Sequence, residues 1–157
     1  MLLQITKHSD KPHIISYRRD DGTTTWMKAD NFFVQHDLSH FAIEKTLGYA
    51  TAFMGMLNNG MDIKDFENRE KRLQLTITAE ACYAENMANL FLIDAVRDKF
   101  DDFNAVLASS FANMQQPIKP PVLTDIEQDT IRQYLKSLLE NWNQLTPGQT
   151  MTLSFDI

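Results

Sequence analysis

The last eight residues of the chain, TMTLSFDI at 150–157, alternate strictly between polar and apolar side chains. This period of two is typical of a β-strand that buries one face. The residues expected on that face are Met151, Leu153, Phe155 and Ile157. A strand needs a partner, and the other β-prone segments lie at the beginning of the chain, at 2–7, 13–19 and 23–28. We therefore expect one sheet that holds both ends of the chain.

The sequence between these ends has the spacing and the caps of helices. Helices are predicted over about 31–47, 49–59, 73 or 78 to 99, 101–114 and 124–145. Gly48 is suited to end the first of them, and Thr124 with Glu127 forms a capping box at the start of the last. The fold predicted is α+β: a small antiparallel sheet, made of an N-terminal meander plus a C-terminal strand, packed against about five helices.

Length and composition limit the class of protein. The 157 residues are 43% hydrophobic and 23% charged, and no linker divides them, which predicts a single domain over 1–157. The net charge is −6 and the basic residues are scattered, which argues against nucleic acid and anionic membranes as partners. The single cysteine and the absence of a signal-like apolar run favour a cytoplasmic location. A small molecule remains a possible partner, and the oligomeric state is left open.

The stretch FVQHDLSHFAIEK at 33–45 places ionisable side chains in an otherwise apolar helix. On a helical wheel with His36 at 0°, His40, Glu44 and Asp37 fall at about 40°, 80° and 100°. Apolar residues that should face the core share this sector. A charged group there pays a large desolvation penalty unless it is paired. These four residues are therefore expected to contact each other, another helix, a metal or a substrate.

The spacing of the two histidines suits a metal. His36 and His40 are four residues apart, so both imidazoles can point at one divalent ion, with zinc as the expected metal. Asp37 is the candidate catalytic base. Glu44 lies about 12 Å along the helix from His36 and is too far away to share an ion with both histidines. It is expected instead either to accept a hydrogen bond from His40 and so to orient that ring, or to pair with a basic side chain.

A third ligand should come from another helix. In the segment LTITAEACYAENMANLFLIDAV, four alanines in the apolar stripe would let a neighbouring helix approach closely. Glu80 and Glu85 flank this stripe on opposite sides, and either is a candidate ligand. Cys82 lies about 140° from the centre of the stripe and is ranked lower. His8 and His13, in the N-terminal meander, also remain open.

The HDLSH segment resembles the HExxH helix of zinc metalloproteases, with Asp37 at the position of their general-base glutamate. No motif that would supply a third metal ligand follows downstream, so the resemblance does not imply peptidase activity for this chain. HDxxH is also similar to the motif of the ubiquinone-biosynthesis accessory proteins, but Ala52 stands where that family has a further glutamate.

A wider resemblance rests on HDLSHFAIEKTLGY, followed by FMGMLNNG and by WNQLTPGQTMTLSF. These segments together resemble a group of small uncharacterised bacterial proteins with an HDxxHxxxE helix. The resemblance implies that His36, Asp37, His40 and Glu44 belong together, and it brings no known activity.

Two classes of function are compatible with these residues. The first is a protein that binds a divalent metal through the HxxxH helix. The more specific form of this hypothesis is a metal-dependent hydrolase. The second is a non-enzymatic protein in which the buried His/Asp/Glu cluster only orders the core. A binder of a small ligand, with the histidines as hydrogen-bond donors, is a further alternative. Whether the protein is an enzyme stays open at this point.

Overall fold

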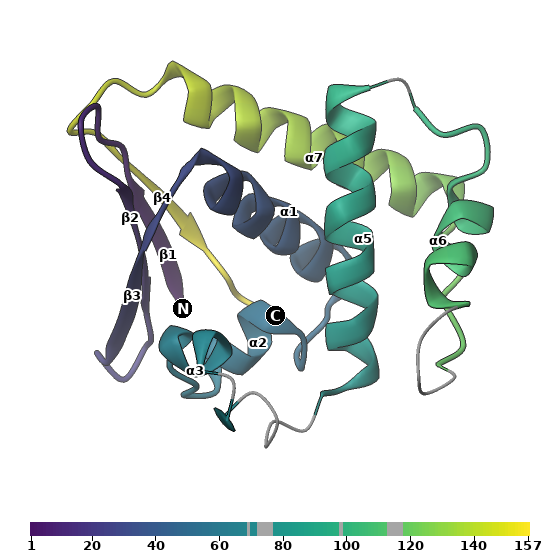
Figure 1. The fold of residues 1–157 in the computed structure, drawn as a ribbon, viewed down its shortest axis with the longest axis horizontal. Helices are drawn as coiled ribbons and strands as arrows, with labels where there is room; N and C mark the ends of the chain where they lie inside the picture. The colour runs from purple at the N-terminus through teal and green to yellow at the C-terminus, as the bar shows by residue number, and fades with distance from the viewer. Residues whose placement is uncertain (69, 72–76, 98, 113–117) are drawn as a thin grey trace.

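The computed structural model describes residues 1–68, 70–71, 77–97, 99–112 and 118–157. This part of the chain contains four strands and six helices (Figure 1). In chain order they are β1 (Leu2–Thr6), β2 (His13–Arg18), β3 (Thr24–Ala29), α1 (Asn31–Leu47), α2 (Phe53–Asn58), α3 (Ile63–Glu67), α5 (Ala79–Val96), α6 (Phe103–Phe111), α7 (Asp125–Gln144) and β4 (Thr150–Ser154). The α+β prediction is confirmed. None of the helices described is both long and apolar enough to cross a membrane.

The four strands form one antiparallel sheet in the order β3-β2-β1-β4. The C-terminal strand therefore pairs with β1, as the alternation predicted. Leu3 lies opposite both Tyr17 and Leu153, and Ile5 lies opposite both Ile15 and Met151, so these side chains form two inward-facing rows. Figure 1 shows the helices on one side of the sheet and the two chain termini near each other.

Ile157 does not follow the predicted alternation. Phe155 is buried, but Ile157 is 51% exposed. Backbone hydrogen bonds to the sheet continue past β4 as far as Phe155, whose amide and carbonyl pair with Met1 at 2.8 and 3.1 Å, and the pairing described ends before Ile157.

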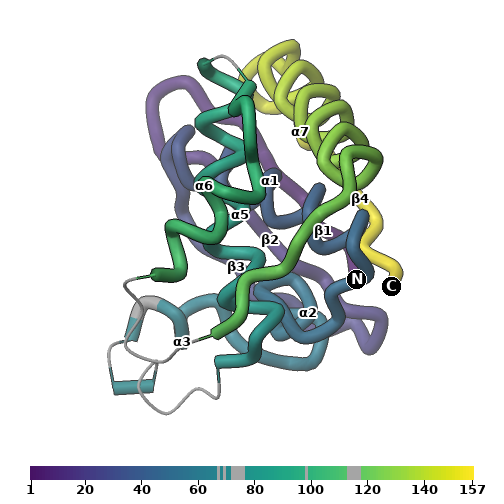
Figure 2. Tube along the Cα trace, turned by 90° about the vertical axis from the view of Figure 1, so that its right-hand side faces the viewer, coloured from purple at the N-terminus to yellow at the C-terminus, as the bar shows by residue number. Residues whose placement is uncertain are grey.

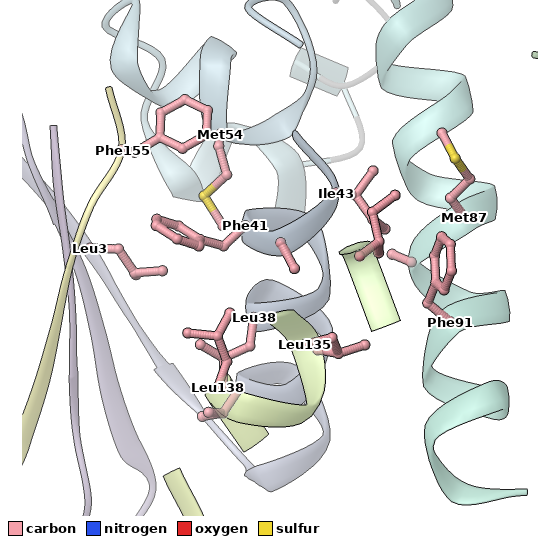
Figure 3. Close-up of a cluster of buried hydrophobic side chains, with 14 of the residues drawn as sticks. Leu3, Leu38, Phe41, Ile43, Met54, Met87, Phe91, Leu135, Leu138 and Phe155 are labelled. Carbon is pink, nitrogen blue, oxygen red and sulfur yellow. The ribbon is translucent and has the colours of Figure 1, made fainter. Parts of the chain in front are cut away.

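Helix α1 runs through the centre of the molecule and has the predicted bounds. Asp30 caps its start by accepting from the Phe33 amide at 3.0 Å, and Gly48 ends it with a φ of 69°. In Figure 3, Leu38 and Phe41 lie toward Leu3 of the sheet, whereas Ile43 faces Met87 and Phe91 of α5. Viewed from the opposite side to the sheet, α5 and α6 lie in front of α1, and α7 lies beside it (Figure 2). Helix α1 is thus covered on several sides, which is why its polar side chains must find partners inside the protein.

The shorter helices differ from the sequence-based prediction. Helix α2 covers Phe53–Asn58 rather than 49–59, and α3 was not predicted. Helix α5 begins after its N-cap Thr78, one of the two predicted starts. The other start, near 73, falls on residues outside those described. Helix α6 begins two residues later than predicted, at Phe103 after the Asp102 cap, and its predicted end near 114 falls on residues outside those described.

Candidate metal centre

Three side chains of the kind that bind metals meet between α1 and α5. His36 and His40 lie one turn apart on α1, and Glu85 reaches them from α5. The distance from Glu85 Oε1 to His36 Nε2 is 3.6 Å, and that from Glu85 Oε2 to His40 Nε2 is 3.2 Å. One ligand atom from each of the three residues lies within 4.8 Å of the other two. This group can hold a metal ion.

Small side chains bring α5 close enough for Glu85 to reach α1. Ala84 and Ala88 of α5 are buried, and the Ser39 hydroxyl on α1 donates to the Ala88 carbonyl at 3.1 Å. This contact shows that the two helices approach closely at this point, where both have small side chains. The central part of the predicted stripe, Ala84, Ala88 and Phe91, is buried, whereas Ile77 and Ala95 at its two ends are exposed. Glu85 lies at the edge of the buried part.

Glu44 orients His40 from the far side of the ring. Its Oε1 accepts from His40 Nδ1 at 3.0 Å, which is the hydrogen bond that the spacing predicted. Its Oε2 accepts from the backbone amides of Met54 and Gly55, at 2.8 and 3.3 Å, at the start of α2. A carboxylate that accepts from Nδ1 leaves Nε2 as the nitrogen that can bind an ion, an arrangement common around metal-bound histidines.

Without a metal, the same contacts favour a proton on His40. Burial alone would lower the pKa of His40, but the hydrogen bonds to Glu44 and Glu85 outweigh it and raise the pKa to about 9. Glu44 has no exposed surface, and burial raises its pKa. The Glu85 side chain is 59% exposed, and the imidazoles of His36 and His40 hold its pKa well below the usual range. A metal at this site would therefore have to displace the His40 proton.

Asp37 lies beside the histidines and is buried. The Tyr17 hydroxyl, which points inward from β2, donates to its Oδ2. Burial raises the pKa of Asp37 to about 6, although the hydrogen bond from Tyr17 and the nearby histidines oppose this rise. Burial also raises the pKa of Tyr17, so its proton stays on the phenol. Asp37 is therefore a carboxyl group that can exchange a proton near neutral pH.

A cavity of about 330 Å³ adjoins these residues. His36, Asp37, His40 and Glu85 all line it. The rest of its lining is largely apolar and consists of Met27, Lys28, Phe33, Phe53, Ile63 and Phe66. The possible metal ligands and the candidate base thus face one space large enough for a small molecule.

Glu80, the other predicted carboxylate, is held elsewhere. Its Oε2 accepts from the Thr51 amide at 2.7 Å and from the Thr51 hydroxyl at 2.6 Å. These bonds fasten the start of α5 to the loop between α1 and α2. The structure therefore brings Glu85, rather than Glu80, into the group with the histidines.

The other candidates from the sequence also lie outside this group. Cys82 is partly buried, and burial raises the pKa of its thiol. His13 Nδ1 accepts from the His8 amide at 3.1 Å, and its ring packs edge-on against Trp142. These contacts lie at the end of the sheet near α7, away from the metal group.

Several residues that shape the site were not identified from the sequence. Tyr17 belongs to a segment predicted only to be β-prone, and nothing in its sequence pattern indicates that its hydroxyl reaches Asp37. Lys28, Phe53 and Phe66 come from three different elements. They meet because α2 packs against α1 and α3 packs against β3, and no local sequence pattern encodes that packing.

Comparisons with protein-family models, with curated proteins and with solved structures find no match to the chain. The resemblance to proteins with an HDxxHxxxE helix therefore stays a prediction, and the function has to be argued from the site itself.

Proposed function

We propose that the protein binds one divalent transition metal through His36, His40 and Glu85 and uses it to hydrolyse a small molecule in the adjacent cavity. The observation that carries the proposal is the convergence of three ligand atoms from two helices within 4.8 Å. The bond from His40 Nδ1 to Glu44 supports it, because it presents Nε2 to the ion. Two histidines and one glutamate are a donor set that suits zinc and leaves a fourth position for water.

Asp37 supports the hydrolytic part of the proposal. It lines the same cavity as both histidines, and its pKa of about 6 leaves it mostly ionised at pH 7. A carboxylate in this state can accept a proton from an attacking water. The water oxygen then bonds to the acyl carbon of an ester or amide. The bond to the leaving group breaks, and Asp37 returns the proton to that group.

Metal binding is tested on protein purified without a histidine tag. Calorimetric titration with zinc, nickel and manganese should give one site per chain, and the site should be lost in His40→Ala and strongly weakened in Glu85→Gln. Two matched variants, Glu80→Gln and His8→Ala, change the same residue types outside the group and should bind like the parent. Parent protein that neither binds these ions nor is stabilised by them would refute the proposal.

The role of Asp37 is tested with p-nitrophenyl butyrate and the zinc-loaded protein. Asp37→Asn keeps an oxygen that can accept from Tyr17, so the fold should be retained. Loss of a general base typically lowers the rate by a factor of about 10² to 10⁴. The zinc affinity should stay within a few-fold of the parent. A variant as active as the parent would remove Asp37 from the mechanism.

One observation favours a second candidate, in which the cluster is only structural. Both ring nitrogens of His40 already have carboxylate partners, Glu44 and Glu85. Among the residues described, no buried side-chain nitrogen or oxygen lacks a hydrogen-bond partner. The cluster could in that case simply tie α1, α2 and α5 together.

Thermal melts with and without a chelator separate the two candidates. If the cluster holds the fold, the double variant His36→Leu with His40→Met should be far less stable than the chelated parent. Breaking a buried charged pair typically costs roughly 3–5 kcal/mol. If the cluster serves a metal, zinc should raise the melting temperature of the parent and not that of the variant; if the cluster is only structural, zinc should stabilise neither protein.

A further inference from the structure

The cavity beside the metal group has two chemically different parts. His36, Asp37, His40 and Glu85 form its polar end. Five side chains of the remaining lining are apolar: Met27, Phe33, Phe53, Ile63 and Phe66. Its volume of about 330 Å³ lies at the small end of the range for ligand pockets. The shape and lining fit a small molecule with an apolar group.

Aromatic rings form much of the apolar lining and pack against one another. The Phe53 ring is centred 5.1 Å from the His40 ring and 5.1 Å from the Phe66 ring. Phe33 is 49% exposed, so part of its ring faces solvent. Aromatic side chains in such arrangements favour contacts with other aromatic or branched apolar groups.

Lys28 connects this cavity to a second depression. It lines both, as does Phe33, and the second depression, of about 470 Å³, also contains His8 and Lys11. Within the described residues, the Lys28 amine forms neither a hydrogen bond nor an ion pair. The acid in this depression, Asp30, already accepts from the amide of Phe33 as the cap of α1. The depression therefore contains two lysines, Lys11 and Lys28, and one carboxylate, Asp30, on a chain whose net charge is −6.

From these contacts we propose that the cavity binds a small carboxylate with an apolar, preferably aromatic, group. The apolar group lies among Phe33, Phe53 and Phe66, and the carboxylate pairs with Lys28. Lys28 is an exposed basic residue of the lining, and its charge attracts an anion, whereas Asp37 and Glu85 of the same lining disfavour the carboxylate near the histidines. The proposal rests on the proposed metal centre, because it names the class of compound that the same cavity would present to the metal.

The probes for this proposal are 4-phenylbutyrate, its neutral amide 4-phenylbutyramide, and butyrate. Calorimetry on the zinc-loaded protein should show that phenylbutyrate binds about fivefold more tightly than the amide, which is the upper range for one exposed ion pair. It should bind at least about tenfold more tightly than butyrate, because butyrate lacks the phenyl group that buries apolar surface. Zinc content is measured on the same samples.

Two lysine variants identify the charge that matters. Lys28→Met should abolish the preference for the carboxylate over the amide. Lys64→Met should preserve it, because Lys64 is an exposed lysine on α3 that lies over the Trp26 ring and does not line the cavity. No binding of phenylbutyrate at millimolar concentration would overturn the proposal.

Metal-free protein separates failure of this proposal from failure of the metal centre. If the carboxylate preference survives in Lys28→Met but disappears when zinc is removed, the carboxylate sits on the metal, and the role given to Lys28 is overturned. If the parent holds no zinc but binds phenylbutyrate through Lys28, the metal centre fails and the ligand cavity is supported.

Discussion

Glu44 contacts His40 with one carboxylate oxygen and the start of α2 with the other. Glu44→Gln tests its role in choosing the metal-binding nitrogen. The glutamine oxygen can still accept from the Met54 amide, but its NH₂ group would then face His40 Nδ1. This moves the ring proton to Nε2 and blocks that nitrogen. Loss of such a partner typically lowers metal affinity about 10- to 100-fold.

Zinc titration of Glu44→Gln checks this prediction. Glu80→Gln is the matched control, because it makes the same chemical change on a glutamate held by Thr51. Equal zinc affinities for the two variants would show that Glu44 does not orient the ligand.

His40 makes the stability of the metal-free protein depend on pH. Its pKa of about 9 in the folded state lies above the value of about 6.5 expected when unfolded. A raised pKa means that the proton binds the folded state more tightly. The stabilisation is therefore complete below pH 6.5 and is lost as the pH rises through 9. The free energy of unfolding of the chelated protein should fall by a few kcal/mol across this window.

Urea unfolding between pH 6.5 and 9.5, at constant ionic strength and with a chelator, measures this loss. His40→Gln removes the titrating ring and should show a flatter profile. Asp37 has a pKa of about 6, so its titration changes the stability mostly below pH 6.5, outside the range measured. Parallel profiles for parent and variant would contradict the assignment to His40.

Part of the site could be predicted from the sequence at the scale of single residues. The wheel positions of His40 and Glu44 predicted their hydrogen bond, since both lie on one helix whose geometry is known. It could not choose between Glu80 and Glu85, because both flank the stripe that faces α1. That choice depends on how far α5 is shifted along α1, which is a matter of tertiary packing. The contact between Tyr17 and Asp37 depends in the same way on how the sheet lies against α1.

Helix α2 supports the site through its first backbone amides, and Gly55 allows its position. A Cβ at Gly55 would lie 2.1 Å from the Ala50 carbonyl oxygen, a backbone atom that cannot move aside alone. Gly55→Ala should therefore displace α2, cost about 1–3 kcal/mol as overpacking does, and weaken zinc binding through Glu44.

Gly48→Ala is the matched control for this variant. Gly48 has open space around it but a φ of 69°, so alanine there should cost about 1–2 kcal/mol from backbone strain alone. Urea unfolding and zinc titration compare the two. Normal zinc affinity in Gly55→Ala would mean that the position of α2 does not matter to the site.

The elements with strong local signals were the ones the sequence predicted well. Helix α1 has an aspartate cap and a terminal glycine, and α7 has the full capping box of Thr124 and Glu127. Helix α2 was predicted too long because Tyr49 to Ala52 look apolar, although Thr51 is in fact held by Glu80 in a loop. Helix α3 has five residues, too few for a helical period to be recognised.

At the scale of the whole molecule, β4 joins the end of the chain to its beginning. Met151 pairs opposite Ile5, and the Phe155 amide donates to the Met1 carbonyl at 2.8 Å. Deleting 149–157 should remove cooperative thermal unfolding, because it uncovers β1 and removes the buried Phe155. A second truncation lacking only 156–157, which are exposed, should melt cooperatively.

Differential scanning calorimetry of the two truncations checks this prediction. An unchanged melting curve after the longer deletion would contradict the view that the chain forms one cooperative domain. That view remains a prediction from the sequence, which contains no linker.

The central claim is that His36, His40 and Glu85 bind one metal ion. Anomalous diffraction at the zinc edge, from crystals of the zinc-loaded protein, tests it most directly. We predict one peak per chain, about 2.0–2.2 Å from His36 Nε2, His40 Nε2 and a Glu85 oxygen. A peak at Cys82 or at the histidines of the meander, or no peak between α1 and α5, would contradict the account.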